Sequence, residues 1–229
     1  PHADSTLVIA VTRDSVRAWF VAGRKSLAER GDVQAIQGDV ATPEGLDAVV
    51  KTISAQEPRL HVLINNAGIT WGAPVDKFPA AAFDSVMAVN VRAPFQLVQA
   101  LLPQLEAAAS DDDPARVINI GSVYGISTQV QTAWSYGASK AAIHHLTATL
   151  AAELAPRRML VNAIAPGFFP SKMTHFVMKD DGRRDEMMKY IPLGRPGAAD
   201  DVAGLALFLS SRAGSYMTGN VIPLDGGVL

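Results

Sequence analysis

The chain has 229 residues, 48% hydrophobic and 18% charged, with a formal net charge of −2. These values are typical of one globular α/β domain, and they give no reason to expect a nucleic acid or an anionic membrane as partner. No apolar stretch reaches the roughly eighteen residues of a membrane span, so we expect a soluble, cytoplasmic protein. The absence of cysteine excludes disulfides and thiol catalysis.

Three segments near the start have strand character. Residues 7–11 are a continuous apolar run that predicts a buried parallel strand, and residues 19–22 and 33–37 predict the second and third strands. Only six residues, 13–18, lie between Thr12 and the second strand, whereas a crossover between parallel neighbours needs about ten to twelve. Either the topology here is unusual, or the polypeptide carries further residues that this sequence lacks. We favour the second explanation because the later segments have normal proportions.

The next segments alternate helix and strand. Thr42 followed by Pro43 predicts a capped helix start. Residues 60–64 predict a fourth strand, which ends in Asn65-Asn66-Ala67-Gly68. Small residues at a strand end let backbone approach a ligand closely, although Asn and Gly also form ordinary turns.

A long apolar stripe over residues 83–105 predicts a helix. Asn90 is a poor helix former in its middle, and Pro94 predicts a kink. Taken alone, Asn90 is most simply a hydrogen-bonded core amide. The acidic run at residues 110–114 is most simply a solvated turn, and we expect no metal site.

Residues 117–120 predict a fifth strand that ends at Ser122, on the edge where α/β sheets place their ligands. The chain shows neither a histidine–acid pair nor a Gly-x-Ser-x-Gly elbow for a nucleophilic serine, so a hydrogen bond to a carbonyl oxygen is the better role for Ser122.

Tyr136 and Lys140 are four residues apart in a segment that predicts a helix, so they share one face. We expect the Lys140 ammonium to lower the pKa of Tyr136 towards neutral pH. His144 and His145 follow on the same helix. Because adjacent positions point to different faces, packing or a subunit contact is favoured over joint metal ligation.

The last third contains a sixth strand at residues 160–164, then Pro166-Gly167-Phe168-Phe169-Pro170-Ser171. Residues 172–191 mix methionines and aromatics with charges, which fits a mobile substrate flap or a plain amphipathic helix. Residues 198–211 predict a helix, and residues 220–224 predict the last strand. No repeat or linker divides the chain.

Five motifs in order resemble the short-chain dehydrogenase/reductase family: Asn65-Asn-Ala-Gly68, Asn90, Ser122, Tyr136-x-x-x-Lys140 and Pro166-Gly167. Within this family the chain is similar to the β-ketoacyl (3-oxoacyl) reductases of the rhamnolipid-biosynthesis type. The resemblance runs from about Asp32 to the C-terminus. It implies a Rossmann-like, doubly wound parallel sheet of about seven strands in a single domain.

The resemblance also implies the site. Tyr136 would be the proton donor, Ser122 would bind the carbonyl oxygen, Lys140 would assist Tyr136 and hold the nicotinamide ribose, and Asn90 would support a proton relay through a bound water. The implied cofactor-binding positions are Thr12, Arg24, Lys25, Asp39, Val40, Asn66, Ala67, Gly68, Tyr136, Lys140, Pro166, Gly167, Phe169 and Ser171.

At the end of the second strand, the basic pair Arg24-Lys25 favours NADP(H) over NAD, because it suits a 2′-phosphate; a solvated basic loop is the alternative. Asp39 is equally compatible with a loop acid. The family's Thr-Gly-x-x-x-Gly-x-Gly turn, which cradles the cofactor pyrophosphate, is absent after Thr12.

We therefore expect NADPH-dependent reduction of a carbonyl, with a 3-oxoacyl thioester as first choice of substrate. Another ketone, a sugar or a steroid alcohol is the alternative, and a family member that binds nucleotide without turnover is a second class. A homo-oligomer, tetramer or dimer, is implied by the resemblance.

Overall fold

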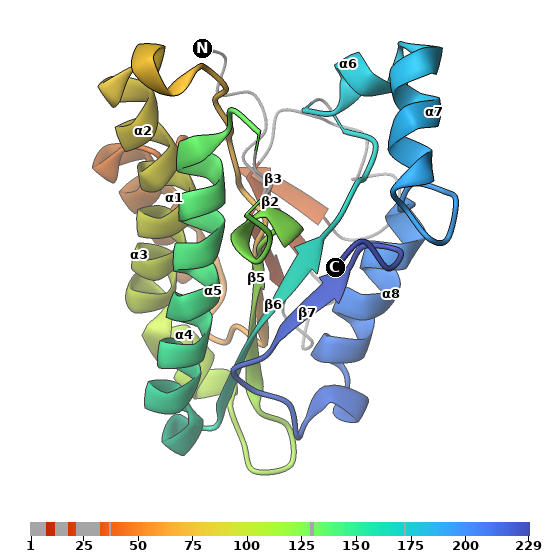
Figure 1. Cartoon of the computed structure of the whole chain (residues 1–229). Helices are drawn as coiled ribbons and strands as arrows, with labels where there is room; N and C mark the ends of the chain where they lie inside the picture. Colours follow the sequence, from red (N-terminus) through yellow and green to blue (C-terminus); the bar gives the residue numbers. More distant parts are fainter. Residues whose placement is uncertain (1–7, 12–17, 22–32, 37, 129–130, 172) are drawn as a thin grey trace.

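The computed structural model describes residues 8–11, 18–21, 33–36 and 38–229, apart from 129, 130 and 172. A single sheet has the strand order β3-β2-β1-β4-β5-β6-β7 and runs through the middle of the molecule (Figure 1). Its seven strands are β1 (Val8–Val11), β2 (Ala18–Val21), β3 (Val33–Ile36), β4 (Val62–Asn65), β5 (Ala115–Ile120), β6 (Met159–Pro166) and β7 (Val221–Leu224). Helices flank this sheet, which gives the expected Rossmann-like α/β fold.

The strand β1 departs from the prediction, because it runs antiparallel to both of its neighbours. Val11 pairs with Ala18 of β2 and with Val62 of β4, while β2–β3 and β4 to β7 pair in parallel. The expectation of a parallel first strand is therefore wrong. Six residues, 12–17, separate β1 from β2; that length suits a direct antiparallel return and is too short for a crossover with its helix.

Of the two explanations for the short connection, this antiparallel pairing corresponds to the first, an unusual topology. Such a pairing forms without any further residues between β1 and β2. The favoured explanation of missing residues is not required by the structure. The 229-residue chain carries no glycine from Leu7 to Ala22.

Helices cover the two faces of the sheet unequally among the described residues. Figure 1 shows one face against the helices α1 (Pro43–Gln56), α2 (Ala80–Met87), α3 (Ala93–Ala100), α4 (Leu102–Ala108) and α5 (Trp134–Leu154), with the larger core cluster between them. The other face packs on α8 (Ala199–Ser210) around Val62, Ile118, Ile164 and Leu209. The segments α6 (His175–Met178) and α7 (Asp181–Lys189) project beyond the sheet edge above α8.

The predicted helix over residues 83–105 is broken into pieces. A π-helical segment, η3 (Ala88–Arg92), separates α2 from α3 and contains Asn90, and a second break falls at Leu101. A π-bulge widens one helical turn and is frequent at functional sites. The helix after Thr42 begins as expected, because the Thr42 hydroxyl accepts the Gly45 N–H at 3.1 Å.

Buried amides attach α5 to the centre of the sheet. Asn65 and Asn119 are opposite each other on β4 and β5, and the Asn65 Nδ2 donates to Asn119 Oδ1 at 2.8 Å. Asn119 Nδ2 in turn donates to the Thr147 hydroxyl at 2.9 Å, and Thr147 donates to the Ile143 carbonyl on its own helix. Such buried networks fix one arrangement of the groups they join, although Asn65 Oδ1 has no further hydrogen-bond partner among the described residues. These hydrogen bonds therefore fix the position of α5, along its axis, relative to the ends of β4 and β5.

Candidate active site

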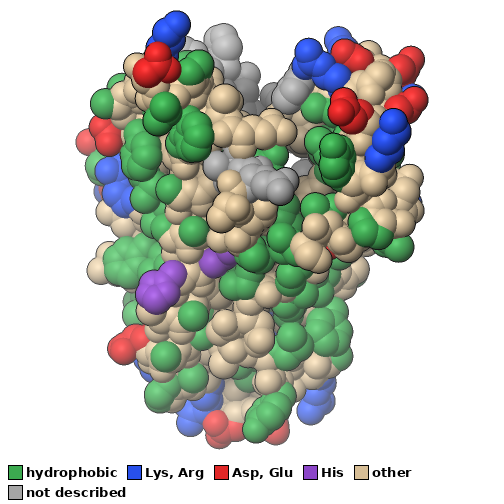
Figure 2. All heavy atoms as spheres, viewed as in Figure 1, with side chains coloured by type: hydrophobic (Ala, Val, Ile, Leu, Met, Phe, Trp, Pro, Cys, Tyr) green, Lys and Arg blue, Asp and Glu red, His purple; other side chains and the backbone are tan. Residues whose placement is uncertain are grey.

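Three neighbouring parallel strands, β4, β5 and β6, end at one edge of the sheet, where ligands of open α/β sheets bind. A cavity of about 510 Å³ opens there, a size within the range of ligand sites. It is lined by Asn66, Ile120, Pro166, Phe169, Pro170, Gly197, Ala198, Ala199 and Val202. Figure 2 shows the surface hollowed between the side that carries α2 and the side that carries α6 and α7.

Ser122, Tyr136 and Lys140 meet at the end of β5, whose last residue Ile120 lines this cavity. Ser122 follows β5 after Gly121 and is close enough to Tyr136 for its side chain to lower the pKa of the phenol, and its hydroxyl accepts the Tyr124 N–H at 3.2 Å. Lys140 is buried on the same face of α5, with its Nζ 5.5 Å from the centre of the Tyr136 ring. Nζ donates to the carbonyl oxygen of Ile120 at 2.7 Å. The structure therefore brings Tyr136 and Lys140, which their spacing places on one helix face, together with Ser122 from the end of the fifth strand.

The expected effect of Lys140 on Tyr136 is wrong for the protein without ligands. Burial raises the pKa of Tyr136 above its usual 10, the hydrogen bond from Ser122 opposes this rise, and the nearby Tyr124 adds to it. Burial also lowers the pKa of Lys140 to about 8. The ammonium lies over the ring, and desolvation of the phenolate is the largest influence on the pKa of Tyr136. Tyr136 is consequently protonated at neutral pH, the state that a proton donor needs.

Asn90 is buried in η3 with its amide group engaged by two partners. Oδ1 accepts the Ile69 N–H and Nδ2 donates to the Ile69 carbonyl, both at 2.9 Å. Nδ2 also donates to Ser139 Oγ at 2.9 Å, and Ser139 donates to the carbonyl of Tyr136. Asn90 is therefore a satisfied core amide that connects the loop after β4 to α5. Its role in a proton relay remains a prediction.

The residues after β4 are arranged for close approach of a ligand. Asn66 is exposed on the cavity wall, whereas Ala67 and Gly68 are buried. A Cβ at Gly68 would lie 3.6 Å from both Asn90 Oδ1 and Lys140 Nζ. Gly68 therefore lies between Asn90 and Lys140.

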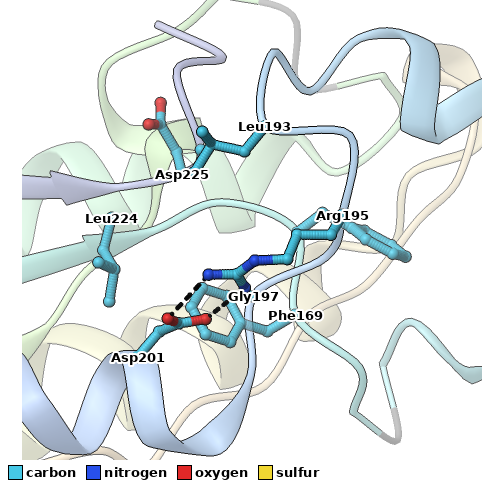
Figure 3. A pocket seen from close by; sticks show the side chains of 9 residues that line it. Phe169, Leu193, Arg195, Gly197, Asp201, Leu224 and Asp225 are labelled. Carbon is cyan, nitrogen blue, oxygen red and sulfur yellow. Dashed lines mark hydrogen bonds and ion pairs between the residues drawn. The ribbon is translucent and has the colours of Figure 1, made fainter.

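The residues after β6 form a second wall of the cavity. Pro166 and Phe169 line it as expected, and Gly167 packs closely on Asp225, with no room for a side chain. Figure 3 shows the Phe169 ring near Gly197, beside the Arg195 guanidinium that faces the Asp201 carboxylate. The two Arg195–Asp201 bonds measure 2.6 and 3.0 Å. This ion pair fixes the turn against which Phe169 packs.

The Ser171 hydroxyl lies 3.1 Å from that of Thr174, whose Oγ1 donates to the Phe169 carbonyl at 2.7 Å. Ser171 is exposed and does not line the cavity. The family-type contact of Ser171 with a nicotinamide amide therefore remains a prediction.

The remaining predicted cofactor positions are less informative. The Asp39 carboxylate accepts the Ala41 N–H at 2.9 Å, as a turn acid does, and Val40 is buried. Thr12, Arg24 and Lys25 lie outside the described residues.

Sequence reasoning missed the local function of two residues. Ser139 links Asn90 to the backbone of Tyr136, and the ring of His144 lies under Ser122. The four-residue spacing of His144 from Lys140 was an available signal, because it puts both residues on one helix face. Among the described residues, no group of three or more potential ligands gathers to hold a metal ion.

Comparison with known proteins shows the family to which this chain belongs. A family model described as "Enoyl-(Acyl carrier protein) reductase" matches residues 8–229. The rhamnolipids biosynthesis 3-oxoacyl-[acyl-carrier-protein] reductase of Pseudomonas aeruginosa is 45% identical over 201 residues, which is 88% of this chain and 78% of the relative. This chain belongs to the short-chain dehydrogenase/reductase family. The 3-oxoacyl-[acyl-carrier-protein] reductase FabG of Thermotoga maritima is 36% identical over 83% of this chain and 75% of its own length.

Solved structures of the family agree with the fold. The Pseudomonas aeruginosa RhlG/NADP active-site complex aligns with a TM-score of 0.86 at 45% identity, covering 89% of this chain and 79% of that one. A gluconate 5-dehydrogenase from Burkholderia cenocepacia, in complex with NADP and tartrate, aligns with a TM-score of 0.80 at 30% identity, covering 90% and 78%.

The residues of this chain fit one end of a nicotinamide dinucleotide. The cavity at the ends of β4, β5 and β6, with the buried ammonium of Lys140 beside it, suits a nicotinamide ribose. For the pyrophosphate the family's glycine-rich turn is missing. Because β1 is antiparallel, its last residue Val11 lies opposite Val62, the first residue of β4, at the edge away from Asn66.

Within the part of the chain that the structure describes, none of the helices has the length and apolar character that crossing a membrane requires.

Proposed function

We propose that this chain is an NADPH-dependent reductase that converts a 3-oxoacyl thioester to the 3-hydroxyacyl product. The observation that carries the proposal is the contact between Ser122 and Tyr136, with Lys140 over the ring, beside the cavity at the strand ends. The relatives at 45% and 36% identity are named as 3-oxoacyl reductases, and the solved relative at 45% identity is an NADP complex.

Bound NADPH supplies the hydride, and the protein supplies one proton and the orientation. The Tyr136 hydroxyl gives its proton to the carbonyl oxygen, which becomes the hydroxyl of the product. The Ser122 hydroxyl donates a hydrogen bond to the same oxygen and orients the carbonyl. Such positioned proton transfer typically contributes about 10²–10⁴-fold to the rate.

Lys140 assists the proton transfer from Tyr136 and contributes to cofactor binding. With a pKa of about 8 it is mostly an ammonium at neutral pH, so it can stabilise the phenolate that Tyr136 becomes after proton transfer. Its Nζ also binds the hydroxyls of the nicotinamide ribose. Asn90 holds Ser139 and, through it, the backbone of Tyr136, and it supports the return of a proton to the site.

We assign the remaining cofactor contacts to the wall residues. The backbone of Asn66, Ala67 and Gly68 holds the adenosine side of the cofactor. Pro166, Gly167 and Phe169 enclose the nicotinamide end, and Ser171 contacts its amide. Arg24 and Lys25 bind the 2′-phosphate, and Asp39 and Val40 lie near the adenine. Residues 172–191 act as a flap over the substrate; the described α7 has no buried residue, as a movable cover requires.

We further propose one cytoplasmic domain that assembles as a homo-oligomer, dimer or tetramer. Its exposed apolar side chains support assembly: Leu207 is 70% and Phe208 40% exposed on α8, and Tyr216 is fully exposed. Figure 2 shows apolar side chains gathered on the face formed by β7 and α8.

A sugar acid is the second candidate substrate, because NADP complexes of gluconate 5-dehydrogenases are among the structural neighbours. NADPH oxidation by the purified protein, measured with 3-oxoacyl thioesters, simple ketones, keto-sugar acids and steroid ketones, separates the candidates. We expect kcat/KM for the thioesters to exceed that of the other carbonyls by about 100-fold. Preference for a keto-sugar acid would select the second candidate, and NADPH binding without oxidation of any carbonyl would indicate a non-catalytic member.

A further inference from the structure

Lys140 and His144 are one turn apart on the buried face of α5, and both side chains reach the end of β5. Lys140 Nζ donates to the Ile120 carbonyl at 2.7 Å. The backbone N–H of Ser122 donates to Nε2 of His144 at 3.4 Å. Side chains from one face of α5 thus bind the backbone groups of Ile120 and Ser122, on either side of Gly121. At this point the chain leaves β5 and turns.

Two glycines make room for the His144 ring. A Cβ at Gly121 would lie 2.1 Å from His144 Nε2, and one at Gly125 would lie 2.7 Å from Cε1. Neither distance is sterically possible, so the imidazole fills space that only glycine leaves open. The ring is therefore wedged under the turn that carries Ser122, between the end of β5 and the short helix η4 (Val123–Gly125).

The contact requires a neutral ring. Nε2 can accept the Ser122 N–H only when it carries no proton, so the ring proton belongs on Nδ1. Burial, and next the charge of Lys140, lower the pKa of His144 to about 4. The acceptor is therefore available throughout the physiological range of pH.

We propose that His144 is a positioning residue for the reduction: its neutral imidazole holds the Ser122 N–H, so that the serine hydroxyl stays on Tyr136. The catalytic consequence rests on the proposed function. His144 acts through Ser122 and not on the substrate. His145, the next residue, is exposed and provides a matched control on the same helix.

The kinetic test compares two substitutions of His144. His144→Leu removes the acceptor and keeps apolar bulk, so we expect kcat to fall about tenfold, the rate equivalent of one hydrogen bond. His144→Gln keeps a side-chain acceptor, and its kcat should stay within about threefold of wild type. In both variants KM for NADPH should be unchanged, and His145→Leu should behave as wild type. Full kcat in His144→Leu, or equal losses in both variants that follow their melting temperatures, would overturn the proposal.

A second measurement needs no turnover. In ¹⁵N-labelled protein without cofactor, the His144 signals are assigned by their loss in His144→Gln. We expect the Nδ1–H tautomer with an unprotonated Nε2, and no titration between about pH 5 and 8. An Nε2–H tautomer, or titration near the usual pKa of about 6.5, would overturn the contact with Ser122. If none of the carbonyls supports oxidation of NADPH by wild type, the proposed function fails. The tautomer of His144 still decides whether its ring accepts the Ser122 N–H.

Discussion

Replacing Tyr136 by phenylalanine is expected to lower kcat by about 10²–10⁴-fold, the usual contribution of a positioned proton donor. The substitution removes one hydroxyl, whose side-chain partner is Ser122, and leaves the ring that packs edge-on against Tyr124 with centroids 6.2 Å apart. The fold and NADPH binding should therefore persist. Steady-state rates with the preferred carbonyl substrate, together with the dissociation constant for NADPH and the melting temperature, measure the change.

Two other tyrosines serve as comparisons for Tyr136→Phe. Tyr216→Phe makes the same chemical change at a fully exposed position and should leave the rate unaltered. Tyr124 carries the phenol ring that packs against Tyr136, so Tyr124→Phe tests the rival donor. If Tyr136→Phe keeps more than about a tenth of the wild-type rate, less than the low end of the acid–base contribution was lost and Tyr136 is not the donor.

NADPH should bind this chain only about tenfold more tightly than reduced nicotinamide mononucleotide, which lacks the adenylate half. In the family a glycine-rich turn holds the pyrophosphate with several backbone N–H groups, and hydrogen bonds to charged groups are worth about 1.5–3 kcal/mol each. This chain has no glycine from Leu7 to Ala22, and β1 ends at the opposite edge of β4. A surface ion pair of Arg24 or Lys25 with the 2′-phosphate would add at most about 1 kcal/mol per contact.

Calorimetric titration with the two ligands measures this ratio. Lys140→Met is the matched variant, because it removes a contact to the ribose that both ligands share and should weaken both by the same factor. If NADPH binds more than about a thousandfold more tightly than the mononucleotide, residues of this chain hold the pyrophosphate. A difference of that size requires at least two further charge-assisted hydrogen bonds. Binding of neither ligand would contradict the proposed cofactor itself.

The sequence predicted the part of the site that depends on strand ends. Apolar runs followed by Asn66, Ser122 and Pro166 were sufficient, because the carboxyl ends of parallel strands meet at one edge. The four-residue spacing of Tyr136 and Lys140 likewise predicted one helix face. These features depend on local periodicity and topology, both of which a sequence displays.

Orientation and burial were harder to predict. The six-residue connection before β2 already argued against a parallel β1, but a continuous apolar run such as residues 7–11 is typical of a buried parallel strand and was assigned as one. The pKa of Tyr136 depends on how deeply the phenol is buried, which spacing on a helix does not reveal. The role of His144 depends on two glycines from another segment, so it emerged only when α5 was placed against the end of β5.

The central claim is hydride transfer at this site, and isotope transfer tests it most directly. The protein is incubated with NADPH carrying two deuterium atoms at C4 of the nicotinamide and with a 3-oxoacyl thioester, and the product is analysed by mass spectrometry. We predict a 3-hydroxyacyl thioester with one deuterium at C3, formed by wild type and at a rate lower by about 10²–10⁴-fold in Tyr136→Phe. A 3-hydroxyacyl product without deuterium, or no product from wild type while NADPH is bound, would contradict the account.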